Sequence, residues 1–202
     1  PAYRGKNKRV NDIVMRVQGC FSYSMNAQAS EVGHPPASDS DTMANLLSYM
    51  YWVSSGAPTG DTHMAGRGYP KLKDTSQGFD PKRGEQVFLD NCAVCHGYNG
   101  EGVLRDGVTL FPPLWGDQAY NWGAGMHKIN TAASFIKANM PLGKSNSLSD
   151  QEAWDVAAFI NSMPRPQDPR FNGNVDETTE KFHKSKYDLY GKVQKAGKGL
   201  TQ

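Results

Sequence analysis

The stretch Cys92-Ala93-Val94-Cys95-His96 places two thiols two residues apart and an imidazole directly after the second thiol. This C-x-x-C-H pattern is typical of covalent haem attachment. The two thiols can form thioethers with the two vinyl groups of one haem, and the histidine can bind the iron as the proximal ligand. A thioredoxin-like dithiol and half of a zinc site are the alternatives. The chain has no second cysteine pair and few strand-like runs, so we favour one haem c attached at Cys92 and Cys95.

The segments on both sides of this motif predict two helices that cross each other. Pro81 is a start signal for the first helix, and Gly84 and Phe88 lie four residues apart on one of its faces. The second helix begins with an N-cap and an acidic first turn at 149–152 and ends before Pro164. Because Gly84 has no side chain, the second helix can pack closely against it. Two crossed helices around a covalent haem indicate an all-α, cytochrome c-like fold.

The haem iron needs a second axial ligand, and Met140 is our candidate. It follows His96 at a suitable distance, and a proline and a glycine beside it suit a loop that presents a thioether to the far side of the haem. Met126, Met163 and His127 are alternatives, since a methionine is more often core filler than a ligand. A His96/Met140 pair would raise the reduction potential, which suits an electron acceptor.

The composition excludes several classes of protein. The chain has 202 residues, enough for one large domain or two smaller ones. Its 22 Lys and Arg and 20 Asp and Glu give a net charge of +2, so charge alone does not indicate a nucleic-acid partner. No apolar run approaches the roughly 18 residues of a membrane span. An odd count of three cysteines argues against a disulfide framework, and a start at Pro1 suggests that an export signal or the beginning of the chain is missing.

Residues 1–56 lack a haem motif but resemble the later helical region. A capped amphipathic helix follows 38–41 and ends at 54–56, and its Tyr49 aligns with Phe159. This favours two tandem cytochrome c domains, the first incomplete at its N-terminus, although any two amphipathic helices look alike. We expect four segments: the back half of an N-terminal cytochrome c-like domain (1–56), a linker (57–80), a C-terminal cytochrome c domain with covalent haem (81–164) and an extended C-terminal tail (165–202).

The C-terminal tail (165–202) contains prolines followed by residues of mixed charge. This composition favours a solvated surface with a short helix around 178–190, and docking to an acidic partner is the alternative.

Cys20 follows a cluster of cations. A lone cysteine is usually a small buried hydrophobe, and a basic cluster is usually a solvated tail. Nearby cations, however, lower the pKa of a thiol and favour the thiolate, which binds metals and attacks electrophiles. We therefore predict a pocket for small anions at this place. The cations are Arg4, Lys6, Lys8, Arg9 and Arg16.

Several segments resemble the thiosulfate dehydrogenases, which are dihaem c-type cytochromes. The resemblance extends over much of the chain and is more specific than a haem motif. It includes Arg16-Val17-Gln18-Gly19-Cys20-Phe21, Phe111-Pro112-Pro113-Leu114-Trp115-Gly116 and Ala138-Asn139-Met140-Pro141-Leu142-Gly143, together with residues 24–26, 47–52, 121–126 and 157–170.

The resemblance implies a first haem with a histidine and Cys20 as axial ligands, where catalysis would occur. The second haem, on Cys92, Cys95 and His96, would relay electrons. In some members of the family a lysine beside the distal methionine replaces it as a ligand. Asn139 stands at that position here, so no such exchange is expected.

Two departures from the family pattern bear on the function. The family usually has an acid and an arginine before Ser-Met-Asn, whereas this chain has Ser22 and Tyr23, so we expect one anion-binding guanidinium to be missing. The first haem motif is also missing, so we expect either a truncated chain or a one-haem derivative.

The function implied is the oxidation of two thiosulfates to tetrathionate, or the reverse. Cys20 would hold one sulfur, while Arg16, Arg9 and Lys6 would offset the repulsion between two dianions. A non-catalytic haem c electron carrier, or a haem sensor or subunit of a respiratory assembly, is the alternative. We expect small sulfur oxyanions and a redox partner, such as another cytochrome, as partners. A second haem is expected with the missing segment, and the location is periplasmic because haem c is attached outside the cytoplasm.

Overall fold

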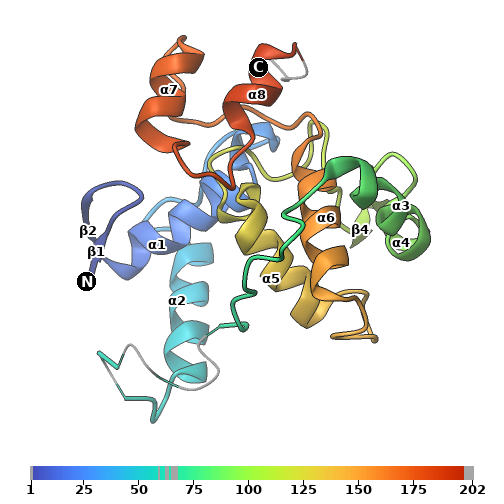
Figure 1. Ribbon diagram of the computed structural model, residues 1–202. Helices are drawn as coiled ribbons and strands as arrows, with labels where there is room; N and C mark the ends of the chain where they lie inside the picture. Colours follow the sequence, from blue (N-terminus) through green and yellow to red (C-terminus); the bar gives the residue numbers. More distant parts are fainter. Residues whose placement is uncertain (1, 59, 62–63, 65–67, 198–202) are drawn as a thin grey trace.

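The computed structural model describes residues 2–58, 60–61, 64 and 68–197, and helices dominate it (Figure 1). Within these residues there are two antiparallel hairpins, each of two short strands. The predicted helical, cytochrome c-like class is therefore confirmed, with the hairpins as additions. The strands are β1 (Ala2–Arg4), β2 (Arg9–Asn11), β3 (Val103–Arg105) and β4 (Val108–Phe111). The helices are α1 (Ile13–Gly19), α2 (Asp41–Val53), α3 (Pro81–Asn91), α4 (Ala93–His96), α5 (Ile129–Asn139), α6 (Asp150–Asn161), α7 (Val175–Phe182) and α8 (Tyr190–Lys195), with short turns η1 (Cys20–Ser24), η2 (Ala27–Ala29) and η3 (Gly125–His127).

Helices α3 and α6 cross at Gly84, as the sequence predicts. A Cβ atom at Gly84 would overlap the backbone oxygen of Asp155 and lie 2.9 Å from Cβ of Phe159. The Phe88 and Phe159 rings meet beside the crossing, with centroids 5.4 Å apart. Arg83 fastens the same crossing, because its Nε and Nη2 each donate to the Asp155 carboxylate at 2.8 Å.

The two predicted helix starts are also present. The Ser149 hydroxyl accepts a hydrogen bond from the backbone N–H of Glu152, and the Glu152 carboxylate accepts one from the backbone N–H of Ser149. This reciprocal pair is a capping box and fixes the start of α6. The Ser40 hydroxyl accepts a hydrogen bond from the backbone N–H of Met43 and so begins α2.

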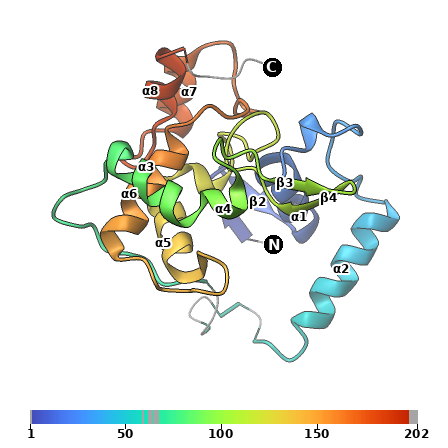
Figure 2. The ribbon, with the colours of Figure 1, turned by 90° about the vertical axis from the view of Figure 1, so that its right-hand side faces the viewer.

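Helix α2 extends away from the body of the molecule (Figure 2). Of its 13 residues, all of them described, Met43 alone is buried. Tyr51 is 65% exposed and Trp52 is 72% exposed. The large apolar side chains of the helix that the sequence assigns to a first cytochrome c-like domain are therefore mostly exposed.

The hydrophobic core lies among α3, α5 and α6 and is extended by the end of the chain. Its largest fully buried side chains include Trp122 and Trp154. The end of the predicted linker (57–80) packs against this core, since the backbone N–H of Leu72 donates to Ser134 Oγ at 3.1 Å. Residues 59, 62–63 and 65–67 of that linker, and residues 1 and 198–202 of the outer segments, lie outside the described residues.

The expectation of a solvated C-terminal tail is wrong. Tyr190 and Val193 belong to the hydrophobic core, and His183 is only 3% exposed. Two helices, α7 and α8, replace the single helix expected around 178–190, and they lie side by side at one end of the molecule (Figure 1). Most described lysines of this segment lie at the surface, but the side chains of Asp168 and Asp188 are buried, which the mixed-charge composition did not reveal. Within the described residues no helix combines the length and apolarity that crossing a membrane would require.

Candidate functional site

The C-x-x-C-H residues lie on the short helix α4 and the residue before it. The backbone N–H of Cys92 donates to the carbonyl of Phe88 at 2.8 Å, and that of His96 donates to the carbonyl of Cys92 at 2.9 Å. The chain therefore continues from α3 into one further turn, which carries Cys92 and Cys95 three residues apart on the same face. Both thiols are free and half-buried.

The His96 ring is oriented by the segment that follows β4. Its Nδ1 lies 2.8 Å from the carbonyl oxygen of Pro112, and its ring meets Phe111 edge-on at 6.2 Å. When Nδ1 donates to that carbonyl, the lone pair is on Nε2, which is the arrangement of a metal-binding histidine. Two thiols and an oriented imidazole are the donor set that covalent haem c requires, so these residues fit the group.

Met140 directly follows α5, and its side chain is half-buried against the core. Its backbone N–H donates to the carbonyl of Ile136 at 2.8 Å, so the position of the residue is fixed by the end of the helix. The rival His127 is 3% exposed, and its Nε2 lies 2.7 Å from Asp188, which occupies that nitrogen. Ligation of iron by Met140 stays a prediction, and His127 is a weaker rival than its sequence suggests.

A pocket of about 350 Å³, called here the anion pocket, lies between the first hairpin and the α1–η1 segment. Its wall contains Arg4, Lys6 and Arg9, together with Gln18 and Tyr23, and none of the described residues that line it is acidic. The hairpin produces this concentration of charge, because Arg4 and Arg9 are paired across β1 and β2. The turn between the strands then brings Lys6 to the same place.

Lys6 is the most perturbed of these cations. Its Nζ lies 3.8 Å from the centroid of the Tyr23 ring. Burial, together with the neighbouring charges of Arg170 and Arg4, lowers the pKa of Lys6 to about 8. An ammonium group that is pressed against other cations favours an anionic ligand.

Cys20 lies beside the anion pocket at the start of the π-helical turn η1. Its backbone N–H donates to the carbonyl of Arg16, and its side chain is exposed. Gly19, the preceding residue, lines the pocket, whereas Cys20 and Arg16 are outside its lining. The structure thus brings Lys6 and Arg9 together with Arg4 and leaves Arg16 exposed on α1. The catalytic roles of Cys20, Arg16, Arg9 and Lys6 stay predictions.

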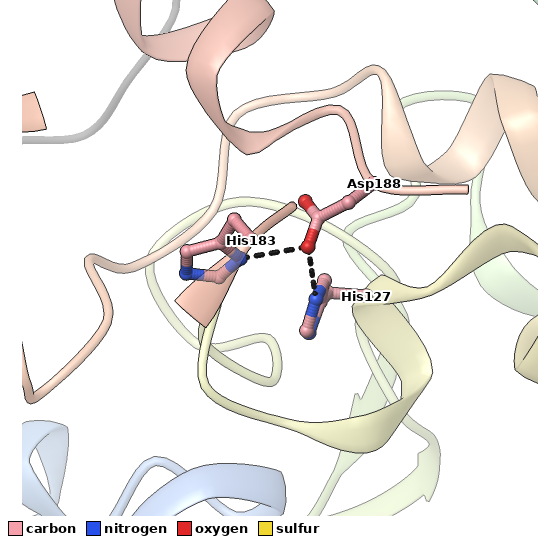
Figure 3. A group of neighbouring side chains, drawn as sticks. All are labelled: His127, His183 and Asp188. Atoms are coloured by element: carbon pink, nitrogen blue, oxygen red, sulfur yellow. Dashed lines mark hydrogen bonds and ion pairs between the residues drawn. The ribbon is translucent and has the colours of Figure 1, made fainter. Parts of the chain in front are cut away.

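Sequence reasoning missed a buried charge network behind the pocket (Figure 3). His127 Nε2 and His183 Nδ1 approach the same oxygen of Asp188 at 2.7 and 2.8 Å. Ligands of a tetrahedral metal ion would be roughly 3.3 Å apart, so these separations are those of hydrogen bonds. On its other side, His183 Nε2 lies 3.0 Å from Asp168. No local sequence pattern links these residues. The only sequence signal for the network is that two histidines and two acids each stand close to apolar residues.

Comparisons with known proteins agree with this geometry. Residues 81–164 match the cytochrome c family. A thiosulfate dehydrogenase of Stutzerimonas stutzeri is 53% identical over 193 residues, which are 95% of this chain and 61% of that protein. Another, from Allochromatium vinosum, is 44% identical over 167 residues, 82% of this chain and 59% of that protein. The chain therefore spans about three fifths of the length of these relatives.

A solved structure shows the same fold. Thiosulfate dehydrogenase TsdBA from Marichromatium purpuratum, in its as-isolated form, superposes with a TM-score of 0.91 at 57% identity. The match covers 94% of this chain and 40% of that one. With the crossed helices, the C-x-x-C-H turn and these similarities together, the chain is similar to thiosulfate dehydrogenases over most of its length, and its residues 81–164 form a cytochrome c domain.

Proposed function

We propose that this chain takes part in the oxidation of two thiosulfates to tetrathionate in the periplasm. The relatives that it resembles are named thiosulfate dehydrogenases, and the chain spans about three fifths of their length. The observation that supports the proposal here is the anion pocket, where Lys6, Arg4 and Arg9 converge beside Cys20. A pocket whose described lining contains cations and no acidic residue suits small sulfur oxyanions.

The cations of the pocket reduce the main barrier to this reaction, which is the electrostatic repulsion between two thiosulfate dianions. Each cation at close range offsets about 1–4 kcal/mol of that repulsion, depending on how much water screens it. Lys6 contributes strongly, because it is half-buried and has no carboxylate in the pocket wall to neutralise it. Arg4 and Arg9 can bind sulfonate oxygens in pairs, which a guanidinium does better than an ammonium.

Cys20 supplies the sulfur nucleophile in this proposal. Its thiolate forms a bond to the sulfane sulfur of the first thiosulfate, and two electrons leave to an external acceptor. The second thiosulfate attacks the same sulfane sulfur, forms tetrathionate and displaces Cys20 as a thiolate. Haem c, when bound through Cys92, Cys95 and His96, supplies a one-electron acceptor. Cys20 would also hold a second haem in this proposal, and a cytochrome or similar protein would be the redox partner.

The first segment, 1–56, is proposed as the back half of a first cytochrome c domain. The open aromatic face of α2 supports this, because Tyr51 and Trp52 need a covering partner. The relatives are also longer than this chain. A haem c electron carrier without catalysis is the second candidate, favoured by the single C-x-x-C-H motif in the sequence. A haem-to-protein ratio of two favours the enzyme, and a ratio of one favours the carrier.

The activity is tested by adding thiosulfate to the oxidised holoprotein and following haem reduction by visible absorption. Cys20→Ala should abolish this reduction, while dithionite still reduces the variant fully. Ser55→Ala, at the exposed end of α2, serves as the control and should behave like the wild type. A Cys20→Ala protein that retains the wild-type rate with thiosulfate would show that Cys20 is not the nucleophile.

A further inference from the structure

Arg170 connects the C-terminal tail (165–202) to the wall of the anion pocket. Its Nε donates to Asp168 Oδ1 at 2.9 Å, and its Nη2 donates to Asp168 Oδ2 at 2.5 Å. Its backbone N–H donates to the same carboxylate at 2.9 Å. The Arg170 side chain is 17% exposed and that of Asp168 is fully buried, so this bidentate pair is shielded from water.

The guanidinium of Arg170 also contacts Lys6 and Tyr23, which line the pocket. Nη1 of Arg170 donates to the backbone carbonyl of Lys6 at 3.3 Å. The Arg170 Cζ lies 5.5 Å from the centroid of the Tyr23 ring and 4.0 Å from that of Phe182 on α7. Arg170 thus sits between a tail helix and Tyr23, while Lys6 contacts that same tyrosine ring through its ammonium group.

Another buried residue of the C-terminal tail, His183, contacts Asp168. His183 Nε2 lies 3.0 Å from Asp168, and His183 Nδ1 lies 2.8 Å from Asp188, whose carboxylate also meets His127 (Figure 3). A ring between two carboxylates can donate to both only as the imidazolium. The ring of Tyr190 stacks on His183 at 4.1 Å, which restricts its rotation. The carboxylate that orients Arg170 is therefore itself fixed by buried groups.

We infer that Arg170 is a positioning residue of the anion pocket: it holds the Lys6 backbone and the Tyr23 ring where Lys6 can face a bound thiosulfate. This inference rests on the proposed function for the ligand, and it makes the C-terminal tail a structural part of the pocket. A lysine could supply the charge of Arg170 but could not form the bidentate pair and reach the Lys6 carbonyl in one fixed plane. Geometry and not charge alone is thus what Arg170 contributes.

The experiment compares Arg170→Gln with Arg170→Lys in the holoprotein. Thiosulfate affinity is measured by calorimetry, and amide hydrogen exchange is measured over residues 2–11. Arg170→Gln should bind thiosulfate about tenfold more weakly, the effect of losing one charged hydrogen bond. It should also exchange faster in the first hairpin. Arg170→Lys should keep part of the affinity, because the charge remains, but should exchange as fast as Arg170→Gln.

Two controls separate positioning from general damage. Arg105→Gln removes an exposed arginine from the β3–β4 hairpin and should match the wild type. Val193→Ala loosens the tail core, lowers the melting temperature and should leave the first hairpin protected. Unchanged hairpin exchange in Arg170→Gln would overturn the positioning role and leave the proposed function standing. A wild-type protein that fails to bind thiosulfate would overturn the proposed function, and the pocket role of Arg170 with it.

Discussion

The backbone of Asp155 on α6 occupies the space that a side chain at Gly84 on α3 would need. This close approach lets the two helices cross and lets Arg83 reach the Asp155 carboxylate with two hydrogen bonds. The crossing sits directly before the C-x-x-C-H turn. Its geometry therefore controls where Cys92, Cys95 and His96 lie.

Gly84→Ala should destabilise the holoprotein by about 3 kcal/mol, because overpacked helix contacts force the backbones apart. Thermal unfolding followed by circular dichroism measures the loss. Gly125→Ala is the matched control, since a Cβ atom at Gly125 would meet nothing within 4 Å. Equal melting temperatures for the two variants would show that the crossing relaxes without cost.

Thiosulfate affinity should fall as the pH rises through about 8. Burial lowers the pKa of Lys6 to about 8, so its ammonium is present below that pH and is lost above it. Calorimetric titrations between roughly pH 6.5 and 9.5 follow the change. Lys6→Arg should keep the affinity and lose the break near pH 8, because arginine stays charged. If the thiosulfate affinity of Lys6→Arg still changed near pH 8, the titrating group would be a residue other than Lys6.

His183→Gln should cost about 2 kcal/mol of stability at pH 5.5, the value of charged hydrogen bonds to Asp168 and Asp188. Burial lowers the pKa of His183, but the hydrogen bonds that its ring donates to those two carboxylates outweigh burial and raise the pKa above 6.5. The stabilisation by the imidazolium is thus fully present below pH 6.5 and is lost as the pH rises through the raised pKa. The difference in melting temperature between wild type and variant should shrink accordingly. If the difference in melting temperature between wild type and His183→Gln stayed constant from pH 5.5 to 9, His183 would not be stabilising the fold as an imidazolium.

Local signals were sufficient for the second domain. The capping residues Ser149 and Glu152, the small residue Gly84 and the stop at Pro164 are short-range features, and the helices follow them. These signals depend on backbone geometry that neighbouring residues determine. The existence and type of α3 and α6 could therefore be predicted before any contact was known.

The tail and the pocket wall could not be predicted in the same way. Arg170 meets Lys6, and His183 meets Asp168, only after distant segments have packed. Mixed charge at 176–198 is typical of a solvated surface, and three buried apolar residues near position 190 are too few to change that composition. Of the pocket cations, Arg4 was visible as part of a cluster, but the pairing of β1 with β2 was needed to place it opposite Arg9.

Met140→Ala should lower the reduction potential of the attached haem, because the His/Met pair is what raises it. The variant should also change the visible spectrum of the oxidised protein, while covalent attachment through Cys92 and Cys95 persists. Met126→Ala is the control, since Met126 is likewise half-buried against the core but was the weaker candidate in the sequence. Spectroelectrochemical titration measures both variants. If Met126→Ala lowered the reduction potential and Met140→Ala did not, the ligand would be Met126. Its neighbour His127 would be a weaker candidate, because its Nε2 already contacts Asp188.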